Sequence, residues 1–176
     1  MANILEVKRK SIGITKKLVE KLNGLKLQKY YFECGLIFMN VILRGSILYA
    51  AECYYDLKEK ELRIIERIEE RFMRSILKTT TGCPIVQLYL ELGQIPARYQ
   101  IMKLRLLFLK SMLHEKEDSR LSLFLNLQLE ESKKGDWIST CMADLKTLGI
   151  YETLEEIKKI TKKQFRNQIN KKTSWG

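Results

Sequence analysis

The sequence predicts an all-α fold of seven or eight helices, and three observations support this prediction. Apolar residues recur every three or four positions along most of the 176-residue chain, which is the period of an amphipathic helix. Residues that cap helices and glycines that end them recur throughout. The chain has only two prolines, and we predict no strand in it. With 45% hydrophobic residues, a chain of this length can bury a core without disulfides or a structural metal.

The N-terminal half is expected to form three helices. Residues 8–22 place apolar side chains on one face, and Asn23-Gly24 ends this first helix. An apolar stretch over about residues 28–53 forms the second. The third opens at Asp56 with a capping box that ends at Glu59, and a list of apolar residues forms its inward face: Leu62, Ile65, Phe72, Met73, Ile76 and Leu77. About half of its charged residues are expected to form i,i+4 ion pairs, Glu59 with Arg63 and Glu70 with Arg74.

The C-terminal half is expected to hold shorter helices. Pro84 and Pro96 each start a helix, since proline suits the first helical turn. The second of these runs to about residue 114, with a core stripe of Ile101, Leu104, Phe108, Met112 and Leu113. An amphipathic segment follows over residues 121–129. The predicted caps of the last three helices are Asp136, Thr153 and Thr161.

A polar break at residues 131–135 (ESKKG) divides the chain in this prediction. Residues 1–130 form a helical bundle and residues 131–176 form a small C-terminal helical unit.

The most apolar stretch, residues 30–51, is long enough to cross a bilayer. Arg44 interrupts it, and an arginine at the centre of a membrane helix costs about 2.5 to 3.5 kcal/mol on insertion scales. Asn40 adds to this cost. We therefore favour a buried core helix over a membrane span, and we expect no membrane partner.

The chain carries a net charge of +11, which indicates a polyanion or an acidic surface as partner. The excess lies at the two ends of the chain and around residues 98–110, whereas residues 30–80 are balanced. The candidate nucleic-acid-binding residues are therefore Lys8, Arg9, Lys10, Lys16 and Lys17, followed by Arg98, Lys103 and Arg105. For any one of them a solvated surface position is an equal alternative. The C-terminal basic cluster over residues 162–172 has two equal interpretations, a nuclear-import signal and a frayed end of the chain.

Catalytic and metal sites have no support in the sequence. Phosphate-binding glycine loops, nucleophile elbows and HExxH zinc motifs are absent. Cys34, Cys53, Cys83 and Cys141 lack the close spacing of zinc ligands, so we expect buried free thiols and neither metal nor cofactor. The N-terminal residues lack the apolar core of a secretory signal, so we expect an intracellular protein, nuclear or cytoplasmic.

One block is more specific than these patterns. Residues 88–99 (LYLELGQIPARY), preceded by residues 31–33 (YFE) and 52–57 (ECYYDL) and followed by residues 135–137 (GDW), resemble in order and spacing the region after the polymerase core of non-LTR (LINE-type) retrotransposon reverse transcriptases. The likeness spans roughly residues 8–170. The chain departs from that pattern at Cys53, where the family usually has Trp, and at Leu104, where the first of two arginines is common.

The resemblance implies a thumb-like helical bundle that grips the backbone of a template-primer duplex. The family's YxDD-type carboxylate pair, fingers, palm and endonuclease are missing from this sequence. We therefore expect no enzyme activity from the chain on its own, no small-molecule substrate, and an RNA or DNA backbone as partner. The missing polymerase core or another protein is a further expected partner. A protein-interaction module and a non-functional truncated retroelement product are the alternatives.

Overall fold

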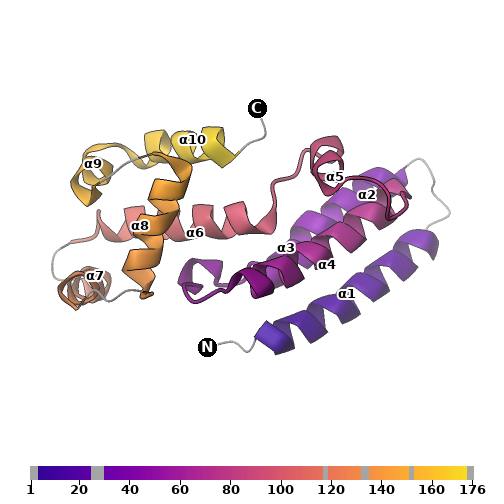
Figure 1. The fold of residues 1–176 in the computed structure, drawn as a ribbon, viewed down its shortest axis with the longest axis horizontal. Helices are drawn as coiled ribbons and strands as arrows, with labels where there is room; N and C mark the ends of the chain where they lie inside the picture. Colours follow the sequence, from indigo (N-terminus) through magenta and orange to yellow (C-terminus); the bar gives the residue numbers. More distant parts are fainter. Residues whose placement is uncertain (1–3, 25–29, 117–118, 132–134, 151–152, 174–176) are drawn as a thin grey trace. The chain divides into compact units, whose positions relative to one another are not determined.

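The computed structural model describes residues 4–24, 30–116, 119–131, 135–150 and 153–173. Helices are its only regular elements in these ranges, which confirms the all-α prediction. Nine helices form there when α2, a π-helical segment and α3 are counted as one continuous helix. The elements are α1 (Ile4–Gly24), α2 (Tyr31–Ile37), the π segment (Phe38–Leu43), α3 (Arg44–Ile47), a short 3₁₀ helix (Ala51–Cys53), α4 (Glu59–Leu77), α5 (Ile85–Glu91), α6 (Ala97–Met112), α7 (Arg120–Glu130), α8 (Trp137–Leu148), α9 (Leu154–Lys159) and α10 (Lys162–Thr173) (Figure 1).

The chain divides into two compact units. Unit 1 comprises residues 1–49 and 58–98, and unit 2 comprises residues 50–57 and 99–176. This differs from the predicted division at residue 130. The physical reason is that α6 and α7 bury their apolar residues in the same cluster as α8, α9 and α10, so the polar break at residues 131–135 lies within unit 2.

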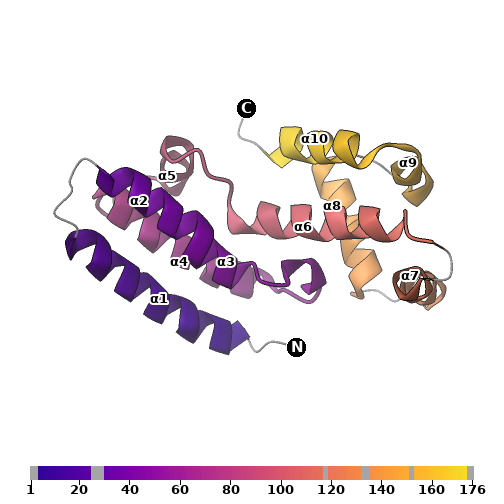
Figure 2. The same cartoon turned by 180° about the vertical axis from the view of Figure 1, so that it is seen from behind.

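In unit 1, α1, the continuous α2–α3 helix and α4 lie side by side (Figure 2). Gly35 permits the close approach of α2 to α4, because a Cβ atom at this position would stand 2.8 Å from Cγ1 of Ile76. The buried apolar residues of this unit come from all of its helices: Leu18, Met39, Leu43, Ile47, Ile65, Ile68, Phe72, Met73, Ile76, Leu88, Tyr89, Leu92 and Ala97.

Helix α4 begins two residues later than predicted. Lys58, and not Asp56, is the N-cap residue, and the carboxylate of Glu61 accepts a hydrogen bond of 2.8 Å from the backbone N–H of Lys58. The later start follows from the extended backbone of Lys58, which lets Glu61 reach back to it. Along α4, Leu62 and Leu77 are half-buried, while Ile68 and Glu69 occupy buried positions in the inward face. The two predicted i,i+4 ion pairs are present.

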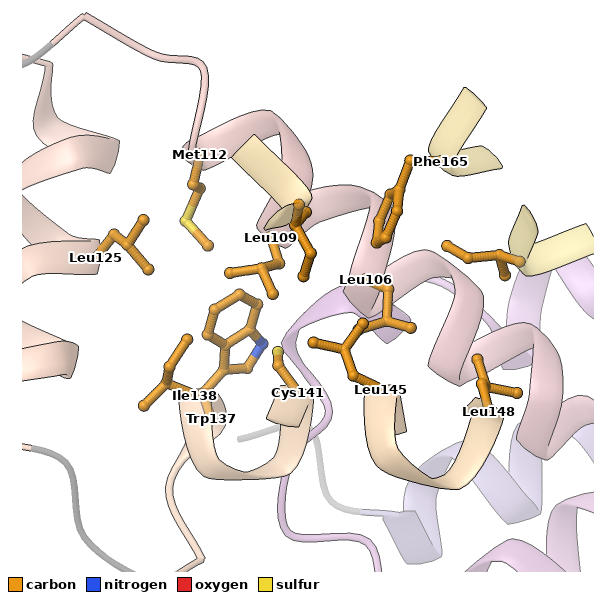
Figure 3. Close-up of a cluster of buried hydrophobic side chains, with 12 residues drawn as sticks. Leu106, Leu109, Met112, Leu125, Trp137, Ile138, Cys141, Leu145, Leu148 and Phe165 are labelled. Carbon is orange, nitrogen blue, oxygen red and sulfur yellow. The ribbon is translucent and has the colours of Figure 1, made fainter. Parts of the chain in front are cut away.

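Unit 2 is built around one apolar cluster, part of which is shown in Figure 3. The ring of Trp137 meets Phe108 edge to face, with centroids 5.8 Å apart. Of the predicted core stripe of α6, Ile101 and Met112 are buried, Phe108 and Leu113 are half-buried against the cluster, and Leu104 is half-buried. The cluster consists of Leu106, Leu109, Met112, Leu125, Trp137, Ile138, Cys141, Leu145, Leu148, Ile157, Phe165 and Ile169.

The three predicted caps in unit 2 are confirmed. The side chain of Asp136 accepts a hydrogen bond from Ser139 N–H at the start of α8, and Gly149 ends this helix with φ +59°. Thr153 and Glu156 form a reciprocal capping box at α9. Thr161 and Gln164 form another at α10.

Residues Ala50–Leu57, which we call the strap, belong to unit 2 although unit 1 residues flank them on both sides. The strap supplies carbonyl oxygens to buried donors. The indole N–H of Trp137 donates to Glu52 O at 2.7 Å, and the hydroxyl of Thr140 donates to Tyr55 O at 3.2 Å. Arg105 donates to the carbonyl of Tyr54.

Across the described ranges, no helix combines the length and apolar character needed to cross a membrane.

Candidate nucleic-acid interface

The basic residues of α1 form one exposed face. Arg9, Lys10, Lys16 and Lys17 are all exposed, and so is Lys21, which we did not select from the sequence. At 100° per residue these five side chains fall within an arc of about 140°. The buried Leu18 lies outside this arc and faces unit 1. Helix α1 therefore presents a cationic stripe to solvent. The side chain of Lys8, the remaining candidate on this helix, lies outside the described residues.

Four of the five basic residues of this stripe have no carboxylate partner in the described chain. Arg9, Lys16, Lys17 and Lys21 form no ion pair with any described residue. Between Arg9 and Lys21, Glu20 is the one acidic residue inside the arc. The stripe thus carries an excess of four positive charges over about 18 Å between Arg9 and Lys21.

Arg98 is part of an internal ion-pair network, contrary to its selection as a phosphate contact. Its Nε donates to Glu66 Oε1 at 2.5 Å, and its Nη2 donates to Glu66 Oε2 at 2.8 Å and to Glu59 Oε1 at 3.0 Å. The hydrogen bonds that Arg98 donates to Glu66 raise the pKa of Arg98, and those that it donates to Glu59 lower the pKa of Glu59. Two carboxylates already satisfy this guanidinium, so it ties α6 to α4 within unit 1.

Arg105 was also selected as a phosphate contact, but it is turned into the fold, and only 6% of its side chain is exposed. Its Nε donates to Asp144 Oδ2 at 2.8 Å, inside unit 2. Burial raises the pKa of Asp144, and the neighbouring guanidinium opposes that rise. A buried charge needs such a partner, which explains why the residue is basic. Lys103, on the same helix, is half-buried and forms no ion pair with a described residue, so it stays a candidate.

Unit 1 contains a buried charged network that was not among the candidates selected from the sequence. Glu69 is fully buried, and its Oε1 accepts a hydrogen bond of 2.8 Å from Arg44 Nε. Its Oε2 accepts from Tyr89 O–H at 3.0 Å and from Ala97 N–H at 3.1 Å. Arg44 also donates to Gln94 Oε1 at 2.6 Å and to the carbonyl of Ile95 at 2.7 Å.

Burial raises the pKa of Glu69, and the Arg44 charge opposes the rise. Burial also raises the pKa of Tyr89. Each polar atom named in this network has a partner, so the network holds α3, α4, α5 and the start of α6 together and is not a free reactive group. The sequence signal for it was Arg44 itself, since an arginine within an apolar helix needs a buried partner.

The remaining chemistry of the described residues is limited. They hold no group of three or more His, Cys, Asp or Glu residues able to bind a metal ion. The expectation of buried thiols holds for Cys141 but not for the others: Cys53 is exposed, and Cys34 and Cys83 are half-buried. Burial raises the pKa of both the Cys141 and the Cys53 thiol.

No family model matches the sequence, and the comparisons with curated proteins and solved structures found no match either.

Proposed function

We propose that this chain is a non-catalytic helical module that binds the sugar-phosphate backbone of nucleic acids, and that it derives from the thumb and post-thumb region of a non-LTR reverse transcriptase. The observation that carries the binding proposal is the exposed cationic stripe of α1. The ordered motifs around residues 88–99 support the proposed ancestry.

The physical basis of the proposed binding is counterion release. Each Lys or Arg that contacts a phosphate releases condensed counterions, so log K falls with log salt by about 0.9 per contact on B-form DNA. Phosphate contacts fix position and carry no sequence information by themselves. The module would therefore bind duplexes of unrelated sequence with similar affinity.

In this proposal the chain binds the nucleic acid and catalyses no reaction. The sequence lacks the carboxylate pair with which the polymerases it resembles hold two metal ions. Its arginines on α3 and α6 stabilise the fold through carboxylates, which leaves the lysine-rich α1 for an external anion.

A fluorescence-anisotropy titration tests this function. The full chain is titrated into a labelled DNA duplex and a labelled RNA/DNA hybrid at 50 to 200 mM salt. We expect binding with a steep negative salt slope, which Lys16→Gln/Lys17→Gln makes shallower by about 1.8 on the DNA duplex, since two contacts are lost.

The matched control is Lys60→Gln/Arg67→Gln, which removes the same charge from exposed positions on α4, in the charge-balanced part of the chain. It should leave the slope unchanged. The proposed role of α1 is contradicted if the wild type does not bind at the lowest salt, or if both variants lose affinity to the same extent.

Self-association is a second candidate function, and α7 is the observation in its favour. Leu123, Phe124 and Leu127 are 54%, 45% and 56% exposed, which is unusual for three large apolar residues on one short helix. A second copy of the chain could cover them. Sedimentation velocity over a concentration series would show a dimer that Leu127→Glu disrupts, and a concentration-independent monomer would exclude this function.

A further inference from the structure

A second cationic surface lies in unit 2, on the last turn of α9 and on α10, whereas the first turn of α9 carries the acidic Glu155 and Glu156. Residues 157–173 contain seven basic and no acidic residues. All seven basic side chains are exposed: Lys158, Lys159, Lys162, Lys163, Arg166, Lys171 and Lys172. We infer that this α9–α10 surface is a second site for a nucleic-acid backbone, separate from α1, so that each unit carries its own. The inference rests on the proposed function and deepens it.

The surface is held in place by a well-packed helix. Phe165 and Ile169 are fully buried and Thr173 is 5% exposed, so one stripe of α10 at i, i+4 and i+8 packs into unit 2. The Thr161–Gln164 capping box fixes the start of the helix. For residues 162–173, the sequence-based alternative of a frayed end is therefore wrong.

The basic residues of α10 surround its packed stripe. At 100° per residue, Lys163 and Arg166 point about 160° and 100° from Phe165 on one side, and Lys171 points about 120° from it on the other. Lys162 and Lys172 have directions closer to the stripe and are exposed at the two ends of the helix. Lys158 and Lys159 are exposed in the last turn of the preceding helix. Asn167 and Gln168, also exposed on α10, add neutral donors of the kind that contact phosphate and sugar oxygens.

Six of these seven charges have no carboxylate partner among the described residues. Lys158, Lys159, Lys163, Arg166 and Lys172 form no ion pair with any described residue. Lys162 donates to Ser111 Oγ at 2.9 Å, which leaves its charge uncompensated. Arg44, Arg98 and Arg105 differ, since each has at least one carboxylate.

Two of the lysines are also placed where they oppose folding. Lys162 and Lys163 stand in the first turn of α10, where the helix dipole is positive and disfavours cations. Like charges packed into one surface repel one another as well. Residues that lower local stability, with no other group of the chain to offset the loss, are expected at a binding site. A bound polyanion would offset both the unfavourable interaction with the helix dipole and the repulsion between like charges.

The lack of exposed large hydrophobic residues on this surface favours nucleic acid over other anionic partners. No large hydrophobic residue is exposed in the described residues after Leu129. A helix that binds a membrane surface needs an exposed apolar face, and the centre of a protein interface is enriched in aromatic and apolar residues. The α9–α10 surface has only charged and polar groups to offer, as a phosphate backbone requires.

Three variants of the full chain test this inference in the anisotropy assay with the DNA duplex. They are Lys163→Gln/Arg166→Gln on α10, Lys16→Gln/Lys17→Gln on α1, and their combination, beside the Lys60→Gln/Arg67→Gln control. Loss of two contacts at a slope of about 0.9 each predicts about 60-fold weaker binding at 0.1 M salt for the α10 variant, and a salt slope shallower by about 1.8. Lys158→Gln/Lys159→Gln on α9 should act in the same direction, and it replaces the α10 variant if circular dichroism shows that variant to have lost helix.

The outcomes separate the two proposals. If the α1 variant weakens binding and the α9 and α10 variants match the control, the second site is wrong and the proposed function stands. If only the α9 and α10 variants weaken binding, the second site stands and the role of α1 is wrong. A wild-type chain that binds neither duplex nor hybrid overturns both.

Discussion

The substitution Glu69→Ala should be among the most destabilising single changes in unit 1. It removes the carboxylate that faces Arg44, whose side chain is 6% exposed, and it removes the acceptor for Tyr89 O–H and Ala97 N–H. Removing one partner of a buried ion pair typically costs about 3 to 5 kcal/mol, because the other charge stays buried without compensation. Two unpaired donors keep the expected cost near the upper end of that range.

The adjacent residue provides a matched control. Glu70 pairs with Arg74 at 2.7 Å, but its side chain is 27% exposed and the pair lies one helical turn apart on α4. Pairs that water reaches contribute about 0 to 1 kcal/mol. Glu69→Ala and Glu70→Ala therefore change the same residue type at neighbouring positions, with an expected difference of about 3 kcal/mol in the free energy of unfolding.

Urea unfolding followed by circular dichroism at 222 nm measures this difference. With an m-value of about 2 kcal/mol per molar, 3 kcal/mol lowers the midpoint by about 1.5 M. Both tryptophans of the sequence, Trp137 and Trp175, belong to the residue range of unit 2, so tryptophan fluorescence follows this unit in the same samples, and its urea midpoint should shift less. The double variant Arg44→Met/Glu69→Leu removes both charges, so it should be less destabilised than the sum of its single changes. Midpoints for Glu69→Ala and Glu70→Ala that agree within error would refute the reasoning.

Two further predictions concern packing and a buried amine. Lys110 is fully buried and its Nζ donates to the carbonyls of Ile157 and Ile160 at 2.5 and 2.6 Å, so Lys110→Met should destabilise unit 2 by about 2 kcal/mol or more in urea unfolding. Burial lowers the pKa of Lys110, so the unfolded chain binds more protons than the folded chain at alkaline pH. The free energy of unfolding of the wild type, measured relative to that of Lys110→Met, should therefore rise between neutral pH and about pH 10.5. A difference that stays flat or falls over this range would contradict the prediction. Gly35→Ala places a Cβ 2.8 Å from the buried Ile76 and should cost about 1 to 3 kcal/mol, whereas Gly45→Ala, whose Cβ would meet nothing within 4 Å, should be neutral or stabilising by up to about 1 kcal/mol. Thermal melts of the two glycine variants check this pair, and equal shifts would show that the close approach of α2 to α4 is not limiting.

Features fixed by neighbours in sequence could be predicted. Asp136, Thr153 and Thr161 cap their helices through residues three positions away, and a spacing of three is visible in the sequence. The all-α class follows from the same local period. The cationic stripe of α1 could also be predicted from the sequence, because Leu18 lies on the inward face and the basic residues lie on other faces.

Features that depend on distant partners could not be predicted. The carboxylate of Glu69 lies 25 residues from Arg44 in sequence, and Asp144 lies 39 residues from Arg105. Helical periodicity assigns charged residues to the solvent face, so it placed Arg105 outside and did not identify Glu69 as buried, although both are buried. The same limit explains why two of the eight candidate binding residues, Arg98 and Arg105, proved to be internal.

The strap has a consequence for cutting the chain. An expression boundary at residue 98 or 99 would release α6–α10 without Ala50–Leu57, and Trp137, Thr140 and Arg105 would lose the carbonyl oxygens of Glu52, Tyr55 and Tyr54 as acceptors. Unit 2 is therefore a discontinuous domain, and neither contiguous half of the polypeptide contains all of it. A fragment that preserves it needs the strap joined to residues 99–176 by a linker, with α4 and α5 left out. For the same reason, a protease that cuts the chain between the strap and α6 need not separate the pieces, because side chains of α6 and α8 still hold the strap.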